Sequence, residues 1–297
     1  MRLASYNIQY SLGQDGRYDM ARVLSAVRDA DVVCLQEVER NWHRSGMVDQ
    51  PALIQELLPD RYAAYGSPFD VDASAPDELG RLINRRRQFG QMTLSRWPIL
   101  AARAHILPKL DTGRRFNMVT GALETVIAAP GGPLRLFNIH LGDASVEERL
   151  LQIEHLMGLL RHSSREGGAW NGTEADPDHW QTENPPPLPA QALLLGDFNA
   201  EPGSAEYVAV TRGTRTARAL PDATSDHHAF VDSWIAAGHQ ARRGITYRRN
   251  PAQLAEWDQR IDYCFLPLAW VPRLMGAHID AEAVGSDHQP IWVELKG

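Results

Sequence analysis

The chain is poor in several features that define whole classes of proteins. It has two cysteines among 297 residues, Cys34 and Cys264, which is too few for a disulfide framework. No apolar run approaches the roughly 20 residues that a membrane-spanning helix needs. No internal repeat or glycine- and serine-rich linker is visible, which excludes a repeat array. Its 30 basic and 37 acidic residues give a net charge of −7, which excludes a generally polybasic nucleic-acid coat protein.

The remaining composition is that of a globular protein. An apolar fraction of 43% and a charged fraction of 23% allow a sizeable core. With no linker in sight, we expect a single domain over residues 1–297. Both cysteines lie inside apolar runs, which favours free, buried thiols in a reducing compartment. Met1 leads directly into a strand-like segment without a signal-peptide core, so the cytoplasm is the expected location.

Short apolar strands alternate with amphipathic helices, a pattern typical of α/β proteins. Asp19 is a plausible N-cap of one helix, and Ser145 with Glu148 has the pattern of a capping box that opens another. Buried strands are predicted at residues 31–35, 134–141, 192–195, 261–266 and 291–295.

Residues 163–190 interrupt this alternation. The segment is rich in Gly, Pro, Asp and Glu and has few aliphatic side chains, so we predict a loop insertion. A mobile surface loop and an ordered substrate lid are both compatible with the composition. Only Trp170 and Trp180 argue for the lid.

Polar side chains that can bind a metal or move a proton recur at the predicted strand ends. They are Asn7, Glu37, His140, Asp197, Asn199, Asp262, Asp287 and His288. Strands of one sheet system bring their ends together, so these residues can converge on one rim. Oxygen ligands suit Mg²⁺ or Mn²⁺ and not a cysteine-rich zinc site. A hard cation beside imidazoles fits hydrolysis of a phosphate ester.

Each of these residues also has an ordinary structural interpretation. Asn7 can cap a turn, and Glu37 can be a solvated residue after a strand. His140 can be a core histidine, and the segment from Asp197 to Asn199 can be an Asx turn. Taken singly, no residue establishes a site.

The order of the motifs is more specific than any one of them. In chain order they are Ser5-Tyr6-Asn7, Leu35-Gln36-Glu37-Val38, Leu94-Ser95-Arg96-Trp97-Pro98-Ile99, Asn138-Ile139-His140-Leu141, Gly196-Asp197-Phe198-Asn199, Arg260-Ile261-Asp262-Tyr263 and Ser286-Asp287-His288-Gln289-Pro290. From residue 3 to about 295, the chain resembles the endonuclease/exonuclease/phosphatase superfamily of metal-dependent phosphoesterases. The resemblance implies a four-layer α/β sandwich, in which two mixed β-sheets pack face to face and helices flank them.

The resemblance also implies a metal site. Glu37 would be the principal ligand of Mg²⁺ or Mn²⁺, with Asn7 close by and Asp287 completing the site or buttressing it. Gln9 stands where some nucleases carry an acidic ligand, so one or two metal ions remain possible.

The other site residues would carry out the reaction. Asp197 would orient or deprotonate the attacking water, and Asn199 would hold the phosphate. His140 would stabilise the transition state or serve the leaving group. His288, paired with Asp262, would contact the scissile phosphate; either Asp197 or His288 could be the general base.

One segment is strongly basic. Residues 81–115 hold nine Lys or Arg residues and a single acid. This segment is either a solvated face or an anion-binding wall of the site, with Arg87 as a substrate-binding residue. Asp226-His227-His228 repeats part of the last motif, and we expect a loop there.

The concentration of basic charge in one segment bears on the substrate. A duplex-binding protein usually spreads Lys and Arg over a long footprint. We therefore favour a small organic or lipid-derived phosphate ester as substrate, with DNA or RNA cleavage as the alternative. A binding module without catalysis is the third possibility, and the complete set of site residues argues against it.

Overall fold

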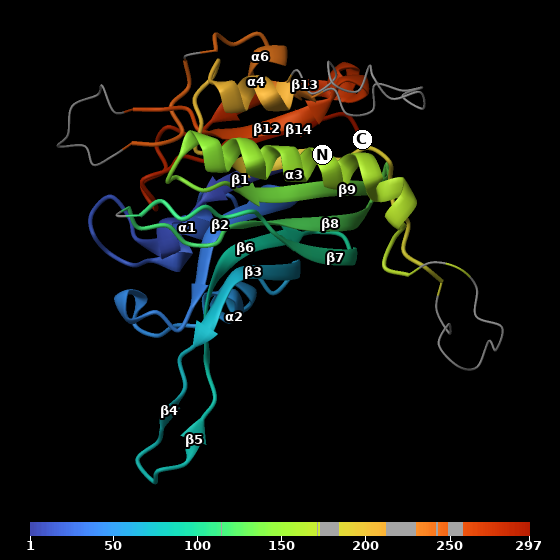
Figure 1. Cartoon of the computed structure of the whole chain (residues 1–297). Coiled ribbons are helices and arrows are strands. Elements are labelled where there is room, and N and C mark those ends of the chain that lie inside the picture. Colours follow the sequence, from blue (N-terminus) through green and yellow to red (C-terminus); the bar gives the residue numbers. More distant parts are fainter. Residues whose placement is uncertain (114, 171, 173–183, 212–229, 242, 249–257) are drawn as a thin grey trace.

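Two six-stranded β-sheets pack face to face, and helices cover their outer sides (Figure 1). This arrangement is seen in a computed structural model that describes residues 1–113, 115–170, 172, 184–211, 230–241, 243–248 and 258–297. It confirms the predicted α/β sandwich. The Asp226-His227-His228 motif and Trp180 lie outside the described residues.

Sheet 1 has the strand order β13-β14-β1-β2-β6-β3. Its strands are β1 (Arg2–Asn7), β2 (Val32–Arg40), β3 (Tyr62–Asp72), β6 (Arg86–Ser95), β13 (Leu274–Ile279) and β14 (Ile291–Leu295). Strands β1 and β2 run parallel, whereas the other neighbours are antiparallel, so the sheet is mixed.

Sheet 2 has the strand order β11-β12-β10-β9-β8-β7. Its strands are β7 (Ile99–Ile106), β8 (Gly121–Ala129), β9 (Gly132–His140), β10 (Leu193–Asp197), β11 (Phe230–Asp232) and β12 (Asp262–Pro267). Here β9 and β10 form the parallel pair, so both sheets place one parallel pair of strands at their centre.

The sandwich has four layers, in the order helices, sheet 1, sheet 2 and helices. Apolar side chains fill the three spaces between them. The middle layer, between the sheets, includes Leu3, Val32, Leu136, Leu195 and Val293, together with the free cysteines Cys34 and Cys264. The burial of both thiols confirms that prediction, whereas the cytoplasmic location stays a prediction. The outer layers join each sheet to its helices, because strands covered on both faces must bury side chains in both directions.

The helices are short, with one exception. They are α1 (Met20–Ser25), α2 (Gln50–Leu57), α3 (Val146–Glu166), α4 (Ala205–Thr211) and α6 (Ser233–Ala236), with 3₁₀ turns η1 (Gln9–Ser11), η2 (His43–Ser45) and η4 (Leu268–Arg273). Asp19 caps α1 as predicted, since its side chain accepts a hydrogen bond from the backbone N–H of Arg22. No described helix is long and apolar enough to cross a membrane.

Helix α3 corrects two details of the sequence analysis. Ser145 is its N-cap, but the Glu148 carboxylate does not return to Ser145; it accepts hydrogen bonds from the Leu110 backbone N–H and from Asn117 Nδ2. The helix continues to Glu166, so the loop predicted at residues 163–190 begins too early. Ser163 is buried and accepts a hydrogen bond from Arg135 Nη1, a tertiary contact that loop-like composition does not reveal.

A long β-hairpin projects from sheet 1. Strands β3 and β6 extend beyond the sheet, and their connection carries the short pair β4 (Ala75–Pro76) and β5 (Leu82–Ile83). This arm points away from the sandwich in Figure 1. Four of the basic residues of segment 81–115 lie on or beside this arm. They are Arg81, Arg85, Arg86 and Arg87.

A polar contact joins the two sheets inside the apolar middle layer. Gln36 of β2 donates a hydrogen bond from Nε2 to Asn138 Oδ1 of β9 at 2.7 Å, and both side chains are fully buried. Asn138 Nδ2 in turn donates to the backbone oxygens of Leu35 and Met92, which belong to the opposite sheet. Because few other partners exist in this layer, the contact favours one alignment of the sheets.

Candidate active site

The predicted site residues surround a single cavity of about 570 Å³. Its lining includes Glu37, His140, Asp197, Asn199, Asp287 and His288. Asn7 and Asp262 lie behind this lining and contact it directly. The two sheets thus bring together eight residues that span positions 7 to 288.

Sheet 2 contributes three neighbouring strand ends. Asp197 is the last residue of β10, and it pairs in register with His140 on one side and Asp262 on the other. Gly196 makes this close spacing possible. Its φ is +146°, and a side-chain carbon there would lie 1.9 Å from the Ile139 backbone oxygen, so no other residue fits.

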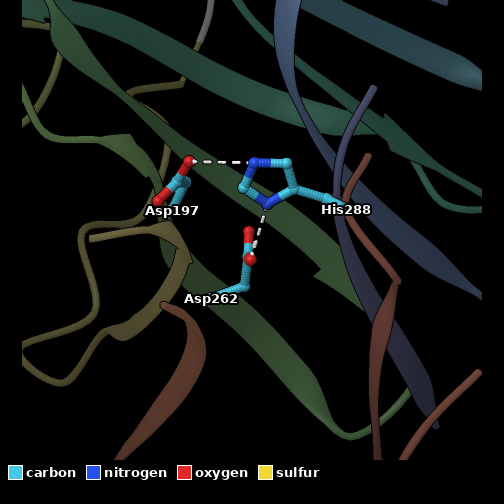
Figure 2. A group of neighbouring side chains, drawn as sticks. All are labelled: Asp197, Asp262 and His288. Atoms are coloured by element: carbon cyan, nitrogen blue, oxygen red, sulfur yellow. Dashed lines mark hydrogen bonds and ion pairs between the residues drawn. The ribbon is translucent and has the colours of Figure 1, made fainter. Parts of the chain in front are cut away.

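His288 bridges the carboxylates of Asp262 and Asp197 (Figure 2). Its Nδ1 lies 2.8 Å from Asp262 Oδ2, and its Nε2 lies 3.8 Å from Asp197 Oδ2. All three side chains are buried. Burial opposes the imidazolium form, but the charge and hydrogen bond of Asp262 outweigh it and raise the pKa of His288. The predicted pairing of His288 with Asp262 is present.

Sheet 1 contributes Asn7 and Glu37. Asn7, the last residue of β1, donates from Nδ2 to Glu37 Oε1 at 3.0 Å and to Asp197 Oδ2 at 2.9 Å. Its Oδ1 accepts a hydrogen bond from the Gln9 backbone N–H, which fixes the orientation of the amide. Asn7 therefore holds together a carboxylate from each sheet, while its predicted role at the metal stays a prediction.

Glu37 lies within a strand and not, as predicted, at the end of one. Strand β2 continues to Arg40, and its pairing with β6 shifts register between Leu35 and Val38. At this bulge Glu37 has φ +60°, a left-handed conformation that is unfavourable for a residue with a side chain. The bulge turns Glu37 towards the cavity.

Asp287 and Glu37 have the chemistry of a metal site. Burial raises the pKa of Asp287 to about 6, and the nearby negative charge of Glu37 adds to this effect. A buried carboxylate whose charge is disfavoured beside another acid favours a cation near both. The oxygen donors fit Mg²⁺ or Mn²⁺. Gln9 donates from Nε2 to Asp287 Oδ2 at 2.9 Å and so helps to orient this carboxylate.

A second group could also hold a cation. Ligand atoms of Asp197, Asp262 and His288 lie within 4.8 Å of one another. The hydrogen bond between His288 Nδ1 and Asp262 already engages two of the three residues, however. This hydrogen bond leaves less room for a cation in the Asp197–Asp262–His288 group, and the roles of Glu37 and Asp287 as metal ligands stay predictions.

His140 and Asn199 border the same cluster. His140 Nε2 lies 3.9 Å from Glu37 Oε1 and 3.8 Å from Asp197 Oδ2, and its ring packs 6.2 Å from that of Phe89. Asn199 donates from its backbone N–H to Asp197 Oδ1 and from Nδ2 to the Leu141 oxygen. Both side chains reach the cavity, and their proposed contacts with phosphate stay predictions.

The basic segment does not form the predicted wall. Arg87 does not line the cavity, because its Nε donates to the Asn41 oxygen and its guanidinium packs against Trp42. Other basic residues pair with acids distant in sequence, in the ion pairs Arg86–Asp70, Arg96–Asp31 and Arg103–Glu124. Among the described residues of the segment, Arg115 is the basic residue that lines the cavity.

Aromatic and basic residues missed by the sequence analysis form much of the cavity wall. They include Tyr10, Trp42, Arg44, Phe89, Phe116, Arg149 and Tyr247. Arg149 lies in helix α3 and Phe89 within strand β6, whereas the others lie in turns and loops, so the seven residues share no motif or periodicity. A signal would have been Trp42 and Arg44, which lie in a polar stretch shortly after the Glu37 motif.

Comparison with known proteins identifies the family of the chain. The model of the Endonuclease/Exonuclease/phosphatase family matches residues 4–288, and the chain therefore belongs to this family of phosphoesterases. No curated protein matches the chain significantly.

Solved structures of the same fold are available from several bacteria. An endonuclease/exonuclease/phosphatase from Beutenbergia cavernae is 21% identical, with a TM-score of 0.60. The match covers 100% of this chain and 72% of the Beutenbergia chain. A mannosyl-6-phosphatase from Bacteroides thetaiotaomicron is 17% identical, with a TM-score of 0.61 and full coverage of both chains. A 3′ phosphatase from Neisseria bound to a product DNA hairpin is 14% identical, with a TM-score of 0.59 and full coverage of both. Identities this low show the fold alone.

Proposed function

We propose that the protein is a divalent-metal-dependent hydrolase that cleaves the phosphate ester bond of a small substrate. The observation that carries the proposal is the convergence of the Asp262–His288 pair, Asp197 and the Asn7–Glu37 pair on one cavity. In this arrangement a site for a hard cation adjoins groups able to exchange protons.

The two halves of the cavity have different tasks. A bound Mg²⁺ or Mn²⁺, held by Glu37 and Asp287, would neutralise charge on the phosphoryl oxygens. Asp262 fixes His288 so that Nε2 faces the cavity, where it can donate a hydrogen bond to the phosphate. Asp197 is then the better acceptor for the proton of the attacking water. Asn199 and His140 are placed to contact the phosphate and the leaving group.

Charge pairing in the cavity supports a small ester over a polyanion. Each of the three arginines that line the cavity pairs with a carboxylate, in Arg44–Glu39, Arg115–Asp143 and Arg149–Glu206. The described part of the cavity wall therefore offers little unbalanced positive charge beyond the expected cation. A substrate with one phosphate group fits this balance better than a polyphosphate or a nucleic-acid duplex.

A nuclease is the second candidate. Aromatic side chains reach the cavity, and Phe116 is 77% exposed there. Such rings can stack on the bases of single-stranded nucleic acid. One solved relative of the fold is described as a 3′ phosphatase bound to a product DNA hairpin.

A metal-dependent assay over a panel of substrates tests the proposal. The panel comprises bis(p-nitrophenyl) phosphate, p-nitrophenyl phosphate, sphingomyelin and supercoiled plasmid, each with Mg²⁺, Mn²⁺ or EDTA. Asp197→Asn and His288→Ala serve as inactive variants. Asp143→Asn is the matched control, because Asp143 lies at the exposed rim of the same cavity.

We expect hydrolysis of a small ester that needs the cation and disappears in both inactive variants. Plasmid nicking with little turnover of small esters would instead favour the nuclease. If the protein hydrolyses no phosphate ester with either cation, the proposed function is wrong.

A further inference from the structure

Arg44 occupies an unusual position on the cavity wall. It lies in the 3₁₀ turn η2, where its guanidinium stacks 3.7 Å from the centroid of the Tyr10 ring and 4.5 Å from that of Trp42. All three residues line the cavity that contains Glu37 and Asp287. The rings hold the faces of the guanidinium, so only its edges remain available for hydrogen bonds.

One edge of Arg44 is occupied and another is open. Nε and Nη2 both donate to Glu39 Oε2, at 3.0 and 2.6 Å. Within the described part of the chain, Nη1 makes no hydrogen bond, and 36% of the side chain is exposed. Arg44 is thus held from one side with its remaining donors accessible from the cavity.

The backbone around Arg44 is strained to keep this arrangement. Among the described residues, seven other than glycine have positive φ, and they fall in three short stretches: Gln9, Tyr10 and Ser11; Glu37, Asn41 and Met47; and Asn199. The first two stretches carry Glu37 and the Tyr10–Trp42–Arg44 cluster. Such strain is typical of positions where a precise side-chain placement matters more than stability.

Neutralising Glu39 does not by itself explain the cluster. Glu39 is fully buried, and Ser45 Oγ also donates a hydrogen bond to it. Arg135, which pairs with the buried Glu124, is itself buried, whereas Arg44 is not buried with Glu39. Arg44 instead presents its free edge to the cavity.

We infer that Arg44, fixed by Tyr10, Trp42 and Glu39, is a specificity-determining residue that binds an oxygen on the organic part of the substrate. This inference rests on the proposed hydrolysis of a small phosphate ester. Because the guanidinium charge is shared with Glu39, one hydrogen-bond acceptor is bound and not a second large anion. The acceptor can be a carboxylate or a hydroxyl oxygen, which present the same lone pairs to Nη1.

The test compares three substrates that differ only in this acceptor. They are phenyl phosphate and its 3-carboxy and 3-hydroxymethyl derivatives, or the methyl diesters of the same phenols if the wild type cleaves only diesters. Steady-state kinetics are measured for the wild type, Arg44→Ala and Arg44→Lys. Arg87→Ala is the matched control, because Arg87 also packs against Trp42 but does not line the cavity.

We expect Arg44→Ala to raise KM about tenfold or more for a substrate with an acceptor, the scale of one charge-assisted hydrogen bond. KM for phenyl phosphate and all constants of Arg87→Ala should stay near the wild-type values. Arg44→Lys keeps a cation beside Glu39 but lacks the Nη1 donor that faces the cavity. This variant should therefore fold as the wild type does and still show the raised KM. The derivative with the larger change identifies a carboxylate or a hydroxyl as the preferred acceptor.

Two results would overturn the inference. An equal rise in KM for phenyl phosphate would place Arg44 on the scissile phosphate. A fall in kcat for all substrates, together with a lower unfolding midpoint in Arg44→Lys, would make its role structural. Both results can be obtained only with an active wild type. A wild type that hydrolyses no ester would contradict the proposed function, and the inference with it.

Discussion

Two clusters of buried charged residues in this protein differ in which charge is in excess. Basic residues outnumber the carboxylate in one, and carboxylates outnumber the bases in the other. In strand β8, the carboxylate of Glu124 contacts Arg103, His105 and Arg135 at 2.7–3.0 Å. Burial disfavours its charge, but these partners outweigh burial and lower the pKa of Glu124 to about 2. In the active-site cluster, carboxylates outnumber the bases that contact them, and the pKa of Asp287 rises to about 6.

The difference separates a structural ion cluster from a functional one. Around Glu124, two arginines and a histidine contact a single carboxylate, so its negative charge needs no cation from outside the protein. Around Glu37, Asp197 and Asp287 the negative charge is incompletely balanced, which favours an external cation and leaves groups able to exchange protons. Loss of a residue should therefore mainly reduce stability in the first cluster and activity in the second.

The largest expected effect is on folding. Glu124→Gln leaves Arg135, only 1% exposed, without its carboxylate, and should lower the free energy of unfolding by about 3–5 kcal/mol. Urea denaturation measures this loss. Glu294→Gln is the control, because the Arg2–Glu294 pair is exposed and should contribute less than about 1 kcal/mol. A small loss in Glu124→Gln would show that the Glu124 cluster does not stabilise the fold.

The second prediction concerns catalysis. Asp197→Asn and His288→Ala should each lower kcat/KM at least about a hundredfold, equivalent to about 2.7 kcal/mol in the barrier. Glu124→Gln should retain the activity of the wild type per folded molecule. Near-normal turnover in both site variants would contradict the assignment of the active-site cluster.

The third prediction concerns metal binding. Mg²⁺ at ten times its dissociation constant should stabilise the wild type by about 1.4 kcal/mol, because only the folded chain assembles the site. Thermal unfolding with and without Mg²⁺ measures the effect. Glu37→Gln should lose most of this response and Glu124→Gln should keep it. An undiminished response in Glu37→Gln would locate the cation elsewhere.

The fourth prediction concerns pH, where the change at each step is small. Since the pKa of Glu124 falls from 4.5 to about 2 on folding, its carboxylate stabilises the protein fully above pH 4.5. This contribution is lost as pH falls through 2, with a slope of at most about 1.4 kcal/mol per pH unit. The difference in unfolding free energy between the wild type and Glu124→Gln should therefore shrink over this range. A constant difference would mean that Glu124 titrates normally.

Strand ends explain why much of the site was predictable. Asn7 and Asp197 end strands whose apolar runs are visible in the sequence, and parallel or antiparallel neighbours then bring His140 and Asp262 beside them. The ordered motifs supplied the family and with it the two-sheet architecture, which alternation of strands and helices alone does not specify.

Features that depend on distant partners were not predictable. The basic residues of segment 81–115 looked like one patch, yet Asp31, Asp70 and Glu124 neutralise several of them from elsewhere in the chain. The bulge at Glu37 and the turn that carries Arg44 rest on positive φ angles, which leave no hydrophobic period in the sequence. Net charge and periodicity are local measures, whereas these features arise from tertiary contacts.

The buried contact between Gln36 and Asn138 has a consequence for how the enzyme can vary. Gln36 immediately precedes Glu37, and Asn138 lies two residues before His140. The contact therefore lies in the core close to the site residues that each sheet contributes. A substitution here would touch neither substrate nor cation, yet it would remove a polar contact that favours one alignment of the two sheets. The distance between the metal-binding and proton-transferring groups is therefore set from within the core, and sequence changes that tune the enzyme need not appear on its surface.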